Sequence, residues 1–143
     1  MSDNIIKLHY DVDGQNFMAA GEASSDVKKV LMQLGIDAKT IRNVAIAMYE
    51  GEINMVIHAS GGEADVIVYD DYVEIILSDK GPGIPDVDLA MQEGYSTAPD
   101  NIRSLGFGAG MGLPNMKKYT DDMKIETKLN EGTKITMKVN IAK

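Results

Sequence analysis

The sequence predicts a single α/β domain, and three features of the chain support this fold class. Several short segments alternate apolar and polar side chains, which is the pattern of half-buried strands. Two longer segments, residues 16–34 and 38–58, are predicted to be helices that end at glycines. Hydrophobic residues make up 44% of the 143 positions, so the chain can bury one sizeable core.

The N-terminal third is predicted to contain one strand and one helix. Residues 4–12 alternate between two faces, with Ile6, Leu8 and Tyr10 on one and Lys7, His9 and Asp11 on the other. A turn follows, and a helix over residues 16–34 is expected to end at Gly35. His9 is expected to be a surface residue, because it is a lone histidine on the polar face of a strand.

The second helix, residues 38–58 with Asp37 as its N-cap, is apolar on most sides. Its two apolar stripes are Ile41, Val44, Ala45, Met48 and Met55, and Ile46, Ile53 and Ile57. Asn43, Glu50 and Asn54 fall together between these stripes. A half-buried carboxylate and amide need partners. Either they form a solvent stripe or helix-to-loop hydrogen bonds, or Asn54 binds a hard cation and Glu50 orients or deprotonates a hydroxyl. Glu52 points away from Asn54 on helical geometry, so Glu50 is the predicted base.

A predicted hairpin, residues 64–69 and 72–78, leads into the segment Asp79-Lys80-Gly81-Pro82-Gly83. An aspartate at a strand end before glycines is often only a turn former. Asp79 could equally accept a hydrogen bond from an exocyclic amine such as N6 of adenine. The residues alone leave both interpretations open. Two further strands are predicted at residues 123–129 and 133–141, joined by a turn at 130–132.

A glycine-rich loop precedes the last predicted helix, residues 113–119. Its glycines alternate with other residues at Gly106, Gly108, Gly110 and Gly112. Backbone amides of such a loop and of a following helix start can hold a phosphate chain. A flexible surface loop is the alternative. The aperiodic stretch before it, residues 94–110, is typical of a mobile functional loop or lid. The spacing matches neither a P-loop nor a G-x-G-x-x-G motif.

Composition limits the classes of partner. The net charge of −8 argues against direct binding of nucleic acid or of an anionic membrane, and favours a protein or small-molecule partner. The chain has no cysteine, so it has neither a disulfide framework nor a thiolate site. Without a signal peptide or a long apolar run, the cytoplasm is the expected location.

Taken in order, three signals resemble the N, G1 and G2 boxes of the GHKL ATPases, the superfamily of gyrase, Hsp90 chaperones, histidine kinases and MutL. They are Glu50-x-x-x-Asn54, Asp79-x-Gly81-x-Gly83 and the 106–112 glycine loop. The resemblance implies a Bergerat fold, an α+β two-layer sandwich with a mixed, mostly antiparallel sheet, helices on one face and an ATP lid over residues 91–110. It covers residues 38–141, and residues 1–143 are expected to form one kinase domain.

Roles follow from the resemblance residue by residue. Glu50 would be the catalytic base, Asn54 the Mg²⁺ ligand, and Asp79 the partner of the adenine amine, with Gly81 and Gly83 beside the base. Thr133 would join the water network near the adenine. The remaining expected contacts to ATP come from the lid hinge and phosphate cradle: Gly106, Gly108, Gly110, Met111, Gly112 and Leu113.

Within the superfamily the chain resembles the bacterial anti-sigma-factor and switch serine/threonine kinases, and the run from Gly112 to Pro114 places it nearer the switch kinases. The expected function is Mg²⁺- and ATP-dependent phosphorylation of a small STAS-domain protein, with a sigma factor as a possible second partner and a homodimer as a reasonable assembly. The alternative is a nucleotide-dependent binding module that sequesters a sigma factor or STAS protein with little phosphotransfer.

Overall fold

The structure, a computed structural model, describes residues 6–13, 21–59, 61–84, 87, 91 and 112–142. The predicted strands and long helices are all present in this part of the chain. In order they are β1 (Ile6–Asp13), α1 (Glu22–Gln33), α2 (Ala38–Ala59), β2 (Gly61–Val68), β3 (Tyr72–Asp79), α5 (Gly112–Lys118), β4 (Asp122–Lys128) and β5 (Gly132–Asn140).

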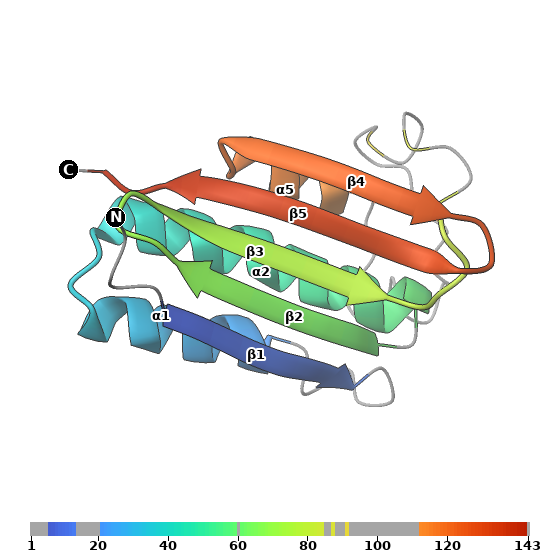
Figure 1. Ribbon diagram of the computed structural model, residues 1–143, viewed down its shortest axis with the longest axis horizontal. Coiled ribbons are helices and arrows are strands. Elements are labelled where there is room, and N and C mark those ends of the chain that lie inside the picture. The colour runs from blue at the N-terminus through green and yellow to red at the C-terminus, as the bar shows by residue number, and fades with distance from the viewer. Residues whose placement is uncertain are drawn as a thin grey trace, which may run out of the picture.

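The five described strands form one sheet in the order β1-β2-β3-β5-β4. Each of its four pairings is antiparallel, so the expectation of a mixed sheet is wrong for the described strands. The reason lies in the connections: β2–β3 and β4–β5 are hairpins, and β5 returns along β3 in the opposite direction. Figure 1 shows α1, α2 and α5 on the same face of this sheet, which confirms the two-layer α+β architecture.

Helix α2 lies at the centre of the helical layer and contacts α1, α5 and four strands. The inward side chains of the sheet and the apolar stripes of the helices make one core, which includes Leu31, Val44, Met48, Val66, Ile75, Met116 and Met137. Gly51 lets α2 lie close to the sheet, because a Cβ at this position would overlap Cδ1 of Leu77 on β3. The core therefore forms where α2 packs against the sheet and against α1 and α5.

Two helix starts are defined by their caps. Asp37 caps α2 as predicted, since its Oδ2 accepts a hydrogen bond from the backbone N–H of Thr40 at 3.0 Å. Helix α1 begins at Glu22, whereas the sequence predicted a start near residue 16. Gly21 has a left-handed φ of 99°, which interrupts any helix entering from the N-terminal side. Residues 14–20 lie outside the described part of the chain.

Strand β2 begins at Gly61, three residues before the strand start predicted at residue 64. Elsewhere the strand predictions hold to within a few residues, although β4 ends at Lys128 and Leu129 is exposed in the turn that follows. None of the described helices is long and apolar enough to cross a membrane.

Candidate functional site

The polar stripe of α2 carries the proposed base and metal ligand. Asn43, Glu50 and Asn54 are all partly buried, between side chains of the core. Burial raises the pKa of Glu50 above its ordinary value of 4.5, because the charged carboxylate loses hydration. A carboxylate with a raised pKa is a stronger proton acceptor, which suits a general base.

Glu52 has a separate task. Its side chain is 2% exposed, and its carboxylate accepts hydrogen bonds from three backbone N–H groups at the start of α1. Oε2 lies 2.9 Å from Gly21 N and 3.3 Å from Ala23 N, and Oε1 lies 2.6 Å from Ser24 N. The carboxylate therefore caps the N-terminus of α1 from the neighbouring helix. Of the two acids on α2, Glu50 and Glu52, only Glu50 takes no part in this cap.

Asp79, at the end of β3, is held by two backbone groups. Its Oδ1 accepts hydrogen bonds from Gly81 N at 2.9 Å and from Thr133 N at 3.2 Å. Asp79 and Thr133 are also direct partners in the β3–β5 ladder. Both of these hydrogen bonds use Oδ1, and neither uses Oδ2. The two backbone N–H groups therefore hold the Asp79 carboxylate through Oδ1.

Gly81 brings the segment after β3 against the end of α2. A Cβ at Gly81 would lie 2.7 Å from Cβ of Ala59, so only glycine permits this approach. Gly83 has a φ of 82°, and the carbonyl of Pro82 accepts a hydrogen bond from Asn130 N at 2.8 Å. The structure therefore joins three elements near Asp79: the end of α2, the 81–84 segment and the β4–β5 turn.

A threonine that the sequence analysis did not select lies beside Thr133. The Oγ1 atoms of Thr127 and Thr133 are 2.9 Å apart, and Thr127 Oγ1 accepts a hydrogen bond from Ile84 N at 2.8 Å. The signal for Thr127 was its position on the inward face of a strand, where a hydroxyl needs a partner. It links the 81–84 segment to the row of Asp79 and Thr133.

The remaining predicted ligands fall partly outside the structure. Gly106, Gly108, Gly110, Met111 and the lid at 91–110, apart from Met91, lie outside the described residues. Gly112 begins α5, and Leu113 is only 6% exposed within the core. Helix α5 packs against α2, so the end of the glycine-rich loop is positioned beside the helix that carries Glu50.

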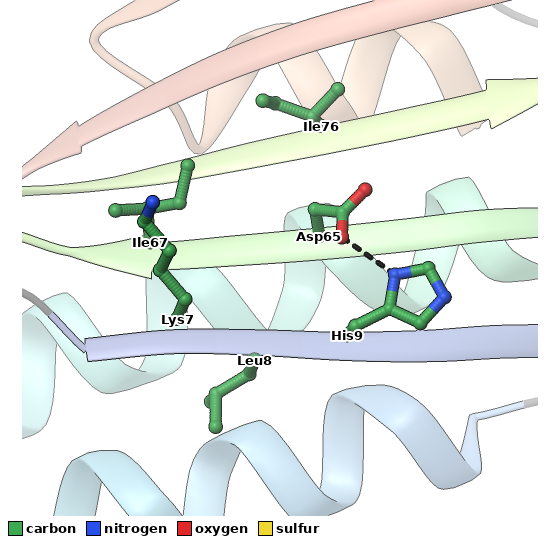
Figure 2. A pocket seen from close by; sticks show the side chains of 6 residues that line it. All are labelled: Lys7, Leu8, His9, Asp65, Ile67 and Ile76. Carbon is green, nitrogen blue, oxygen red and sulfur yellow. Dashed lines mark hydrogen bonds and ion pairs between the residues drawn. The ribbon is translucent and has the colours of Figure 1, made fainter.

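A second polar cluster lies on the sheet face that the helices leave uncovered. An open pocket of about 240 Å³ is lined there by Lys7, Leu8, His9, Asp65, Ile67 and Ile76 (Figure 2). His9 Nδ1 lies 2.6 Å from Asp65 Oδ1, and this carboxylate together with Asp11 raises the pKa of His9 above 6.5. His9 is exposed, as predicted. None of the predicted nucleotide ligands lines this pocket.

The comparisons with known proteins bear on this arrangement. Residues 40–143 match the family described as Histidine kinase-, DNA gyrase B-, and HSP90-like ATPase. The chain belongs to this ATPase family. Its match begins in the first turn of α2 and includes Glu50, Asn54, Asp79 and Thr133.

Relatives that this chain matches over nearly their whole length are named anti-sigma F factor. One from Clostridium novyi (strain NT) is 33% identical over 96% of this chain and 95% of its own length. Another, from Priestia megaterium, is 30% identical over 96% of this chain and 93% of the relative. The resemblance of the sequence had placed the chain nearer the switch kinases, so these relatives shift the comparison toward the anti-sigma branch.

Solved structures show the same fold at low identity. The RsbU and RsbW domains of a Mycobacterium tuberculosis protein superpose with a TM-score of 0.67 at 18% identity, over 96% of this chain and 33% of that chain. The mycobacterial sensor histidine kinase MprB superposes with a TM-score of 0.53 at 16% identity, over 95% of this chain and 98% of that one. Both likenesses concern the fold alone.

Proposed function

We propose that this chain is an ATP-dependent protein serine/threonine kinase that phosphorylates a small STAS-domain partner in the control of a sigma factor. One observation carries the proposal: Glu50 remains on the polar stripe of α2, one turn from Asn54, while Glu52 is used entirely by the cap of α1. Family membership supports ATP as the nucleotide. The anti-sigma F relatives support the class of partner.

The donor set fits an adenine nucleotide and a hard cation. Asp79 offers a fixed carboxylate that can accept from an exocyclic amine, and Gly81 keeps the backbone beside it free of a side chain. Asn54 supplies an amide oxygen, a ligand type that Mg²⁺ accepts alongside phosphates and waters. Bound there, Mg²⁺ would neutralise phosphate charge, which matters in a chain with a net charge of −8.

In the proposed reaction ATP is the phosphoryl donor. The partner's serine or threonine oxygen forms a bond to the γ-phosphorus while the bond to the β-γ bridging oxygen breaks, and ADP leaves. The hydroxyl proton passes to the carboxylate of Glu50, whose raised pKa favours its acceptance. The other residues position the reactants, because phosphoryl transfer depends mainly on alignment and charge neutralisation.

Replacing the Asp79 carboxylate, the proposed partner of the adenine amine, tests whether the chain binds nucleotide at this site. Asp79→Asn should weaken ADP binding by about 1–3 kcal/mol, because an acceptor for the amine becomes a mixed donor and acceptor. Isothermal titration calorimetry of ADP measures the change. Asp65→Asn, on the opposite sheet face, is the matched control and should leave the affinity as it is. Unchanged affinity in Asp79→Asn would remove Asp79 from the site.

The metal role of Asn54 has its own test. In Asn54→Ala the gain in ATP affinity on adding Mg²⁺ should shrink by about fivefold or more, since one oxygen ligand is lost. ADP affinity without metal should change little. Parallel titrations with and without Mg²⁺ give both values. If the Mg²⁺ dependence equals that of the wild type, the cation is bound by other groups.

The anti-sigma F names of the relatives favour a second candidate, a module whose partner binding depends on nucleotide with little phosphotransfer. Incubation with γ-labelled ATP and small STAS-domain proteins separates the two. Label on a partner serine or threonine, absent when Glu50 is replaced, supports the kinase. Partner binding that requires nucleotide but is identical in wild type and the Glu50 variant, with no label moved, supports the module.

A further inference from the structure

Four ionisable side chains of β1 and β2 gather on the sheet face that the helices leave uncovered (Figure 1). In the register of these strands His9 lies directly opposite Asp65, and Asp11 lies directly opposite Glu63. All four side chains are exposed to solvent. Like charges directly opposite each other on one face of a sheet destabilise the strand pair. A cation between Asp11 and Glu63 would therefore be favoured.

The imidazole of His9 is held through one of its nitrogens and presents the other to these two acids. Nδ1 lies 2.6 Å from Oδ1 of Asp65, and Figure 2 shows the second ring nitrogen turned away from that carboxylate. This nitrogen, Nε2, lies 3.3 Å from Asp11 Oδ1 and 3.9 Å from Glu63 Oε1. Histidines that bind metals commonly donate their other ring N–H to a carboxylate, which fixes the ring and its tautomer. Asp65 has that supporting place beside His9.

We propose that His9, Asp11 and Glu63 bind a divalent transition-metal ion such as Zn²⁺. The three ligand atoms already lie within 4.8 Å of one another. Tetrahedral Zn²⁺, with bonds of about 2.0–2.2 Å, places its ligand atoms about 3.3–3.6 Å apart, so small movements of exposed side chains complete the site. An imidazole among the ligands favours a transition ion over Mg²⁺ or Ca²⁺, which prefer oxygen ligands. Asp65 is a positioning residue, because it acts on the ion through the imidazole.

Two strands supply the ligands, so the complete site exists only where β1 pairs with β2. An ion that binds the folded chain and not the unfolded chain raises stability by mass action. Adding Zn²⁺ should therefore raise the Tm of the wild type, and His9→Gln should lose most of this rise. The proposal is independent of the proposed nucleotide site, since none of the predicted nucleotide ligands belongs to this cluster.

Isothermal titration calorimetry of the untagged full chain with Zn²⁺, without nucleotide and with Mg²⁺ present throughout, measures the affinity. Asp65→Asn keeps all three ligands and should weaken binding by about 10–100-fold, and His9→Gln should weaken it at least as much. Glu74→Gln is the matched control, because it removes an acid from the same sheet face outside the cluster and should keep the wild-type affinity. Wild-type affinity in His9→Gln, or an equal loss in Glu74→Gln, would overturn the proposal.

Nitrogen NMR of the imidazole rings identifies the ligand atom, because the chain has only two histidines, His9 and His58. Zn²⁺ should shift the Nε2 resonance of His9 and leave both resonances of His58 unchanged. In Asp65→Asn part of the shift should move to Nδ1 of His9, since the tautomer is no longer fixed by a carboxylate; a purely structural role for Asp65 would not produce this change. A shift confined to His58, or to Nδ1 of His9 in the wild type, would contradict the proposed site.

Discussion

Glu50→Gln should transfer label from γ-labelled ATP to a STAS-domain partner about 10²–10⁴ times more slowly than the wild type, the range typical of losing a general base. ADP affinity should stay close to wild type, because the amide has the same shape and Asp79 is untouched. Glu50 is singled out by burial on the polar stripe of α2, with its pKa raised by lost hydration. Single-turnover transfer at saturating ATP isolates the chemical step.

The pH dependence of the same rate gives a second check on Glu50. A base acts when deprotonated, so the wild-type rate should fall on acidification. Because burial raises the pKa, this fall should be centred above 4.5, the ordinary value for glutamate. The Gln variant should lose this limb of the profile. A variant that transfers at the wild-type rate, or keeps the same acid limb, would show that another group accepts the proton.

Glu52→Ala should lower the free energy of unfolding by about 2–4 kcal/mol, because three backbone N–H groups at the start of α1 lose their acceptor. The side chain is buried, so water replaces it poorly. Urea denaturation at neutral pH measures the loss. Glu52→Gln keeps one acceptor oxygen and should fall between wild type and Glu52→Ala.

Glu22→Ala is the matched control for this stability change. Glu22 is an exposed acid in the first turn of the same helix, so its removal should cost less than about 0.5 kcal/mol. Equal losses in Glu22→Ala and Glu52→Ala would mean that general charge at the helix start matters, and that the buried hydrogen bonds do not. The structural role assigned to Glu52 would then be wrong.

Local patterns explain why so much of the fold could be predicted from the sequence. The Asp37 cap, the polar stripe of α2 and the alternation in β4 and β5 each depend on residues close in the chain. Helical periodicity also predicted correctly that Glu52 points away from Asn54, since its carboxylate is turned toward α1. The arrangement of Asp79 next to Thr133 could be expected only from the family resemblance, because the two residues are 54 positions apart.

The features that sequence reasoning missed are long-range contacts. The reason for Glu52 on α2 lies in α1, about 30 residues earlier, so no local signal reveals it. The reason for Gly51 in the middle of α2 is the close approach of Leu77 on β3, which is likewise a long-range contact. The role of Thr127 depends on two long-range contacts. Its strand β4 pairs with β5 so that Thr127 lies opposite Thr133, and its hydroxyl accepts a hydrogen bond from Ile84 N.

The position of the nucleotide is the central claim, and a crystal structure with Mg²⁺ and a non-hydrolysable ATP analogue tests it most directly. We expect the adenine amine within hydrogen-bond distance of the Asp79 carboxylate, Mg²⁺ beside the Asn54 amide oxygen, and the γ-phosphate facing Glu50. An analogue bound on the opposite sheet face around His9, or an unoccupied space beside Asp79 at saturating analogue, would contradict the account.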